Sequence, residues 1–225
     1  HNIFNNTIRN FTGGTGTVYG IHRTLASGSI YENSVYNLAG GGTIYGLSNG
    51  TGTNNIYRNN INNLSTSSTA TTAGLVSGIY ISGVTNHYVY NNFISDLKAP
   101  LAASTDAIRG INCTATTASS NLGLYYNTIY LNATSSGANF GTSGIYHTNS
   151  TTSTTAQLDM RDNIVVNNST PVGTGLTVAF RRSAANASLN NYSTLSNNND
   201  FYAGTPGPSN LIFNDGTNSD QTLAD

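Results

Sequence analysis

Two short motifs alternate along the whole chain, and this repetition constrains the fold more than any other feature. The first motif reads apolar, aromatic, any residue, Asn, any residue, apolar. Its Asn occupies positions 6, 33, 59, 92, 127, 163 and 199, at spacings of 27, 26, 33, 35, 36 and 36 residues. The second motif, Gly followed by an aliphatic residue, falls between successive Asn motifs and ends in the variant Ala179-Phe180. Repeats of this length are typical of solenoids and related arrays.

The residues within the motifs favour strands over helices. Apolar residues alternate with others, Ile, Val, Tyr and Thr are frequent, and no 3.6-residue stripe is present. One coil of such strands cannot bury its apolar side alone, so coils must stack. The sequence therefore predicts a parallel β-solenoid with three inward rows, which are Ile3, Ile30, Ile56, Val89, Leu124 and Met160; Ile8, Val35, Ile61, Ile94, Ile129, Val165 and Phe201; and Ile21, Leu47, Ile79, Ile111, Ile145 and Phe180.

The composition fits such a solenoid and excludes other classes. Asn (34 residues), Thr (32), Ser (25) and Gly (24) make up more than half of the 225 residues, whereas charged residues are 8% and the net charge is −1. No basic patch for nucleic acid and no apolar run of transmembrane length is present, so we expect neither nucleic-acid binding nor direct membrane insertion.

The Asn excess is explained by columns of Asn at turns. Asn tolerates left-handed backbone dihedrals, and stacked amides can bond along a column. We therefore expect the motif Asn to adopt the left-handed turn conformation. A second, weaker column is predicted at Asn10, Asn37, Asn63 and Asn167, with Asp96 in register.

These rows resemble the right-handed parallel β-helix of the pectate-lyase-like superfamily over roughly residues 1–204. The resemblance implies an all-β, right-handed solenoid of about six to seven coils with 26–36 residues each. It also implies an internal Asn ladder, here Asn6, Asn33, Asn59, Asn92, Asn127, Asn163 and Asn199. Residues 205–225 are expected to form a C-terminal extension or the start of a further coil.

The Thr- and Asn-rich style and the ending at residues 210–225 resemble large secreted β-helix proteins of Bacteroidetes, which are often exported by the type IX system. This implies an extracellular or cell-surface location. The chain begins inside a repeat, so we expect it to be a segment of a longer protein whose further domains are its neighbours.

An aromatic residue stands at the same outward position in five consecutive coils, and Arg161 continues the column after Phe4, Tyr31, Tyr57, Tyr90 and Tyr125. Arg161 is predicted to lie over Tyr125 as a cation–π cap. One interpretation is a glycan-binding surface formed by Tyr31, Tyr57, Tyr90, Tyr125 and Arg161, because aromatic faces stack on sugar rings. The other is a stabilising aromatic ladder, which we favour because stacked rings present their edges to solvent.

Three polar runs, at residues 65–72, 114–120 and 149–155, interrupt the repeats. We expect them to be loops that leave the solenoid on one side. Such loops carry recognition in many solenoids, but they can equally be solubilising spacers, and we favour the spacer interpretation.

Positive and negative side chains are concentrated in two stretches of the sequence. The candidate catalytic residues are Asp106 and Arg109 in the first stretch and Asp159 and Asp162 in the second. Suitably separated carboxylates can act as general acid and base, but nothing in the spacing requires it, so the sequence leans against catalysis without deciding it. Cys113, the single Cys, is predicted to be a small buried hydrophobe, and no metal or cofactor is indicated, calcium included.

We therefore expect an extracellular structural or adhesive segment of a bacterial cell-surface or secreted protein. It would bind a polysaccharide or a cell-surface glycan through exposed loops and the aromatic column. The alternative is a carbohydrate-active β-helix, a polysaccharide lyase or a glycoside hydrolase, whose catalytic residues lie partly outside this chain.

Overall fold

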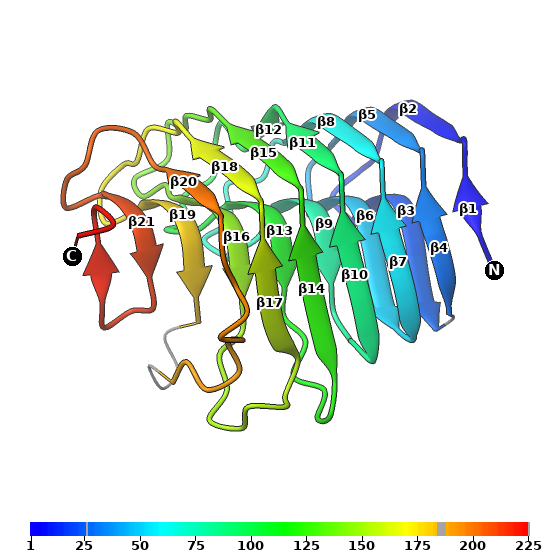
Figure 1. Ribbon diagram of the computed structural model, residues 1–225. Helices are drawn as coiled ribbons and strands as arrows, with labels where there is room; N and C mark the ends of the chain where they lie inside the picture. Colours follow the sequence, from blue (N-terminus) through cyan, green and yellow to red (C-terminus); the bar gives the residue numbers. More distant parts are fainter. Residues whose placement is uncertain (26, 184–187, 225) are drawn as a thin grey trace.

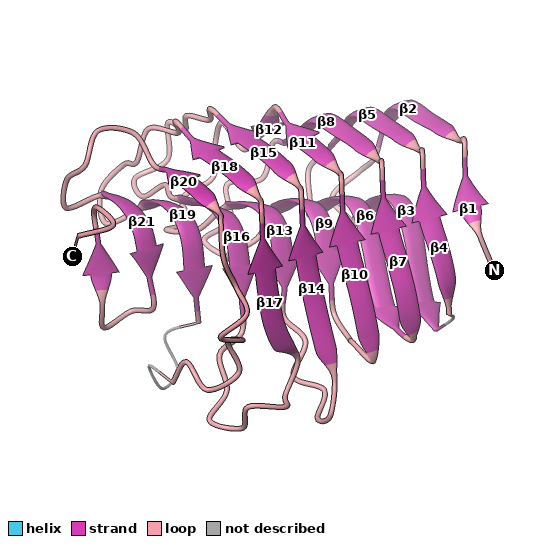
Figure 2. Cartoon of the chain, viewed as in Figure 1, coloured by secondary structure: helices cyan, strands magenta, loops and turns pink. Residues whose placement is uncertain are grey.

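The computed structural model describes residues 1–25, 27–183 and 188–224, and all of the regular structure in these ranges is β-strand (Figure 2). The strands wind around three parallel sheets, here named A, B and C, and most circuits of the chain add one strand to each sheet (Figure 1). The chain is therefore an all-β parallel β-helix, as the repeat predicts. None of the described residues forms a helix that is long and apolar enough to cross a membrane.

The three sheets are defined by their strands. Sheet A contains β1 (Ile3–Phe4), β4 (Gly28–Tyr31), β7 (Thr53–Tyr57), β10 (Asn86–Tyr90), β14 (Asn121–Tyr125) and β17 (Gln157–Arg161). Sheet B contains β2 (Thr7–Thr12), β5 (Ser34–Gly40), β8 (Asn60–Thr66), β11 (Phe93–Ser95), β12 (Leu97–Lys98), β15 (Thr128–Leu131), β18 (Ile164–Asn167) and β20 (Asp200–Tyr202). Sheet C contains β3 (Val18–Leu25), β6 (Ile44–Thr51), β9 (Val76–Ile81), β13 (Ile108–Cys113), β16 (Thr142–His147), β19 (Thr177–Arg182), β21 (Asn210–Asn214) and β22 (Ser219–Asp220).

Residues at the same repeat position pair from coil to coil, so the predicted inward rows are real columns of the core. In sheet A, Ile56 pairs with Val89, and Val89 pairs with Leu124. All three side chains are fully buried. Cys113 also lies in this core, and burial raises the pKa of its thiol to about 12. Stacking thus buries an apolar core although each coil contributes few aliphatic residues.

The Gly of the second motif lies where sheet C packs closely against buried side chains of sheet B. A Cβ atom at Gly110 would lie 2.5 Å from the carbonyl oxygen of Gly144 and 2.6 Å from Cγ2 of Ile129. Gly78 has the same environment, with Ile94 at 2.5 Å. These positions therefore require Gly because no side chain fits there, rather than because of an unusual backbone angle.

The motif Asn residues form a continuous column between sheets A and B, in the chain order predicted. Each Nδ2 donates a hydrogen bond to Oδ1 of the Asn in the next coil, for example from Asn59 to Asn92 at 2.9 Å and from Asn92 to Asn127 at 3.0 Å. The backbone N–H of Asn59 donates to the same Oδ1 of Asn92 at 3.1 Å. Asn33, Asn59, Asn92, Asn127 and Asn163 are buried, so the column satisfies turn amides inside the protein.

The expectation that these Asn residues adopt left-handed dihedrals is wrong by one residue. The positive φ belongs to the residue before each of them, with values of 53–55° at Asn5, Glu32, Arg58, Asn91, Tyr126, Asp162 and Asn198. This residue turns the corner, which leaves the following Asn free to point inward and bond along the column. The position tolerates several residue types because its side chain points outward.

The second Asn column is present at Asn10, Asn37 and Asn63, whose φ values of 49–57° are left-handed. Asn37 Nδ2 donates to Asn10 Oδ1 at 3.0 Å. Asp96 shares this conformation (φ 53°). The prediction is wrong for Asn167, which is buried and whose amide donates to Thr142 and to the carbonyl of Val178.

The polar loops do not leave the solenoid on one side as expected. Residues 67–75 connect sheet B to sheet C, whereas residues 114–120 and 148–156 connect sheet C to sheet A and hang below sheet A in Figure 1. At the first corner, the loop at Gly74 lies against Arg109 and Asn112 of sheet C. At the second corner, the loops project beside sheet A.

At the C-terminal side, β21 pairs with β19 in parallel and thus continues sheet C. The short strand β22 then folds back and pairs with β21 in antiparallel orientation. Asp215 holds the turn between them, since its carboxylate accepts hydrogen bonds from the backbone N–H groups of Thr217 and Asn218. Residues 210–220 thus belong to the same sheet system as the preceding coils.

Candidate functional site

The aromatic column on the outside of sheet A begins as a regular ladder. The rings of Phe4, Tyr31, Tyr57 and Tyr90 stack in sequence, with centroids 5.0, 4.8 and 4.8 Å apart and interplanar angles of 2°, 1° and 3°. Parallel strands in register impose this spacing, because it equals the distance between neighbouring strands. The first four rings thus behave as the stabilising ladder that the sequence favoured.

The ladder breaks at Tyr125, although Tyr125 pairs with Tyr90 in the register of the sheet. Its ring lies beside Tyr88 instead, with centroids 6.4 Å apart, and its hydroxyl donates a hydrogen bond to Asp159 Oδ2 at 3.0 Å. Gly123 permits this position, since a Cβ atom there would lie 2.6 Å from the Tyr125 ring. Neighbouring strands carry Tyr88 and Asp159 at that repeat position.

The displaced ring leaves a slot at the end of the ladder, beside Tyr90. The slot has a volume of about 340 Å³ and is lined by Asn55, Tyr88, Tyr90, Asn91, Tyr125 and Tyr126. Tyr57 covers one face of Tyr90, so the opposite face borders the slot. Tyr126 is 58% exposed because it occupies the left-handed corner position. Rings inside the ladder present only their edges to solvent, but Tyr90 at its end presents one face to the slot.

A second cavity lies on the other side of the Tyr88–Tyr125 pair. It has a volume of about 210 Å³, and its polar lining residues are Asn121, Gln157, Asp159 and Ser193. Ser193 belongs to the loop that follows sheet C, so a sheet and a loop form this cavity together. Tyr88 and Tyr125 line both cavities, so the two cavities are neighbours on sheet A.

Arg161 lies over Tyr125, as predicted, with its guanidinium carbon 5.7 Å from the ring centroid. It also binds Asp159 through two hydrogen bonds, from Nε to Oδ1 at 3.0 Å and from Nη2 to Oδ2 at 2.6 Å. Burial, followed by the hydrogen bond to Asp159, raises the pKa of Tyr125 to about 12. Tyr125 therefore stays protonated and donates, which holds its ring away from Tyr90.

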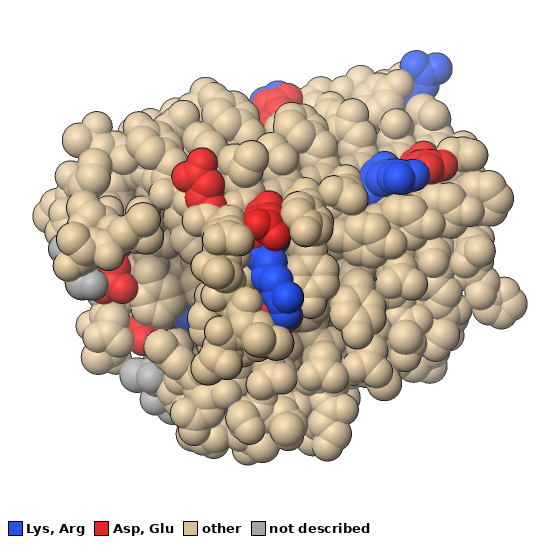
Figure 3. Space-filling view, viewed as in Figure 1, with Lys and Arg blue, Asp and Glu red and all other residues tan. Residues whose placement is uncertain are grey.

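The face of the molecule that carries sheet A is mostly uncharged (Figure 3). Its charged groups include two ion pairs, Arg161–Asp159 at 2.6 Å and Arg58–Glu32 at 3.3 Å. The aromatic site is thus surrounded by amides and hydroxyls rather than by free charges.

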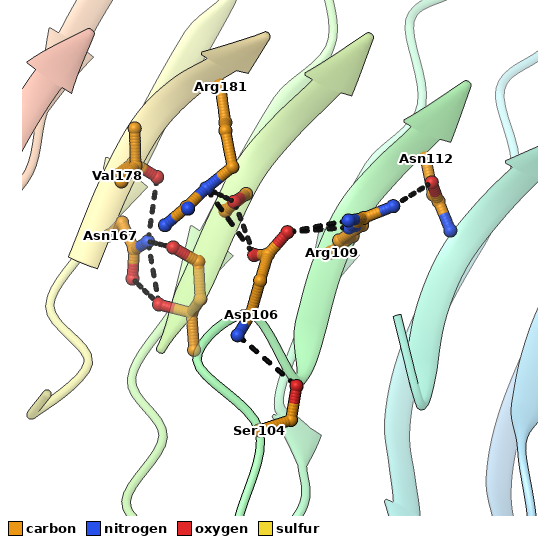
Figure 4. A network of polar contacts seen from close by, with 9 residues as sticks. Ser104, Asp106, Arg109, Asn112, Asn167, Val178 and Arg181 are labelled. Carbon is orange, nitrogen blue, oxygen red and sulfur yellow. Dashed lines mark hydrogen bonds and ion pairs between the residues drawn. The ribbon is translucent and has the colours of Figure 1, made fainter. Parts of the chain in front are cut away.

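Asp106 and Arg109, two of the candidate catalytic residues, form a buried ion pair on the outer side of sheet C (Figure 4). The distance from Arg109 Nη2 to Asp106 Oδ2 is 2.7 Å, and the Ser143 hydroxyl donates to Asp106 Oδ1 at 2.5 Å. Arg181 Nε lies 3.7 Å from Asp106 Oδ1. The loop at Gly74 lies against Arg109, so the pair is enclosed between a loop and the sheet.

The four candidate catalytic residues are not brought together. Asp159 lies on β17 of sheet A and Asp162 at the following corner, whereas Asp106 and Arg109 belong to the sheet C cluster. Besides pairing with Asp106, Arg109 places its guanidinium over the ring of Tyr146, 3.4 Å from the centroid. Within the described ranges, no group of three or more His, Cys, Asp or Glu side chains is arranged to hold a metal ion.

Sequence reasoning missed Tyr88, Tyr126 and Gly123. Tyr88 and Gly123 share one repeat position. The signal is the Gly two residues before Tyr125 on the same strand, because it lets the Tyr125 ring lie across it. Tyr126 occupies the motif position that accepts any residue. Of the predicted binding residues, Tyr90 and Tyr125 line the slot, Arg161 lies over Tyr125, and Tyr31 and Tyr57 lie within the regular ladder.

Comparisons of the chain with protein-family models, with curated proteins and with solved structures find no match. The fold and the arrangement of the side chains therefore carry the functional proposal.

Proposed function

We propose that this chain is an extracellular structural and adhesive β-solenoid segment of a bacterial surface or secreted protein, and that it binds a glycan on sheet A. The break in the aromatic ladder carries this proposal, because it opens a slot between the free face of Tyr90 and the rings of Tyr125 and Tyr126. The resemblance to pectate-lyase-like β-helices of secreted Bacteroidetes proteins supports the extracellular setting.

The chemistry of the slot suits a sugar. Aromatic faces stack against the apolar faces of pyranose rings, and the amides of Asn55 and Asn91 offer donors and acceptors to hydroxyl groups. The stacked β-strands keep these groups in fixed positions, so a ligand does not have to order them upon binding. The regular ladder before the slot then serves as its rigid support.

The test replaces slot residues by the residue that neighbouring coils already carry at the same position. Tyr126→Asn matches Asn91, and Tyr88→Asn matches Asn55. We expect each variant to keep its thermal stability and to bind immobilised glycans roughly five- to tenfold more weakly, since an aromatic contact contributes about 1–1.5 kcal/mol. Affinity on a glycan array, followed by titration with the best ligands, measures this loss.

Tyr130→Ala is the matched control, because Tyr130 is an equally exposed Tyr on sheet B (40% against 40% for Tyr88). It should leave glycan binding unchanged. Equal binding by the wild type and both slot variants, or a loss confined to Tyr130→Ala, would show that sheet A is not the binding surface.

A further inference from the structure

The two cavities on sheet A form one continuous surface that runs obliquely across the strands. The slot is lined by residues of β7, β10 and β14, whereas the second cavity involves β10, β14 and β17. Strands in a sheet are about 4.8 Å apart, so the second cavity is displaced by roughly one strand along the axis. It is also displaced toward the beginning of the strands, where Asn121 and Gln157 lie. A ligand that occupies both therefore crosses the strands and passes over the Tyr88–Tyr125 pair.

The two cavities offer different contacts. Rings dominate the slot, which suits the apolar face of a sugar ring. The second cavity presents Asn121, Gln157, Asp159 and Ser193, which suit the hydroxyl groups of a second ring. Together they reach the size of ordinary small-molecule sites, which is more than one sugar ring requires.

The charges of this surface select against acidic sugars. Among the residues that the structure describes, no Lys or Arg lines either cavity, and the one charged lining residue is Asp159. The nearby Arg161 already donates two hydrogen bonds to Asp159. The carboxylate of a uronate or a sulfate group would therefore meet a negative side chain and lose its hydration without gaining a cation.

On the basis of the proposed glycan binding, we propose that this surface takes an uncharged glycan chain of at least two sugar residues, laid obliquely across the strands of sheet A. The slot holds one ring and the Gln157 side holds the next. The surface discriminates against uronate and sulfated glycans.

The experiment is a calorimetric titration of the protein with gluco-, manno-, xylo- and chito-oligosaccharides of one to four residues, and with oligogalacturonates of the same lengths. For at least one uncharged series we expect the affinity to rise about tenfold or more beyond the monosaccharide, with no dependence on added NaCl. The oligogalacturonates should bind more weakly at every length.

Two variants separate the subsites. Gln157→Ala should remove part of the gain in affinity with chain length, whereas Tyr126→Asn should weaken binding at every length. Affinity that does not rise with length, or oligogalacturonates that bind as tightly as uncharged chains, overturns this inference while glycan binding itself stands. An absence of binding to any glycan overturns the proposed function as well.

Discussion

The Asp106→Asn variant is expected to lower the free energy of unfolding by about 3–5 kcal/mol, because it leaves the buried guanidinium of Arg109 without its counterion. Asp106 is only 4% exposed, and both of its carboxylate oxygens are engaged, Oδ2 by Arg109 and Oδ1 by Ser143. The substitution preserves the shape of the side chain, so the loss reports the charge rather than a cavity. Denaturant unfolding measures it.

A surface pair provides the control. Lys98 lies 2.8 Å from Asp96, but both side chains are about half exposed, and such pairs contribute about 0–1 kcal/mol. Lys98→Ala should therefore change stability little. A loss for Asp106→Asn as small as that for Lys98→Ala would contradict the ion-pair account of sheet C.

The same carboxylate gives this variant a characteristic pH dependence. Burial raises the pKa of Asp106, but Arg181 and Arg109, together with hydrogen bonds from Ser143 and Arg109, outweigh burial and bring the pKa below its ordinary 3.8. A lowered pKa means that the ionised group stabilises the fold above pH 3.8 and loses this effect as the pH falls through the lower value. The difference in the free energy of unfolding between the wild type and Asp106→Asn should therefore shrink as the pH falls below 3.8.

The Asn59→Leu and Asn92→Leu variants are each expected to lower the free energy of unfolding by about 3 kcal/mol or more. Each buried group left unpaired costs about 1–3 kcal/mol, and each variant leaves several unpaired. Asn92 accepts hydrogen bonds from the backbone and the side chain of Asn59, and its own amide donates to the carbonyl of Ile56 and to Asn127. Leucine satisfies none of these buried groups. Thermal and denaturant unfolding measure the loss.

Asn60→Leu is the matched control for the Asn column. Asn60 follows Asn59 directly but is exposed on sheet B, and the same row carries Phe93 and Ile164. An apolar side chain is therefore accepted at this position, and stability should change by less than about 0.5 kcal/mol. If Asn59→Leu were no more harmful than Asn60→Leu, the Asn column would not hold the coils together.

The core of this fold is predictable from the sequence because parallel register repeats every structural requirement once in each coil. Ile56, Val89 and Leu124 align in the sequence for the same reason that they pair in sheet A. The one-residue error at the corner arose because the motif shows which position needs Asn but not which residue bends. Residues 91 and 92 are both Asn. Only the structure shows that Asn91 adopts the left-handed turn conformation and that Asn92 forms the hydrogen bonds of the column.

The sites are less predictable because they depend on departures from the repeat. The position of Tyr125 is set by Gly123, two residues earlier, and by Asp159, one strand further along the axis. The Asp106 cluster recruits Arg181 from far along the chain and is enclosed by a loop that carries no motif. Arg109 pairs with Asp106 on the outer side of sheet C, and the loop at Gly74 lies against it.

The proposed site is tested most directly by nuclear magnetic resonance of the ¹⁵N-labelled protein, titrated with the uncharged oligosaccharide that binds most tightly. The account predicts that the largest amide shifts cluster at residues 88–91, 123–126 and 157–159, on three neighbouring strands of sheet A. Shifts centred on sheet C, on the loops at residues 67–75 or on sheet B would contradict it, as would an absence of shifts with every uncharged glycan tested.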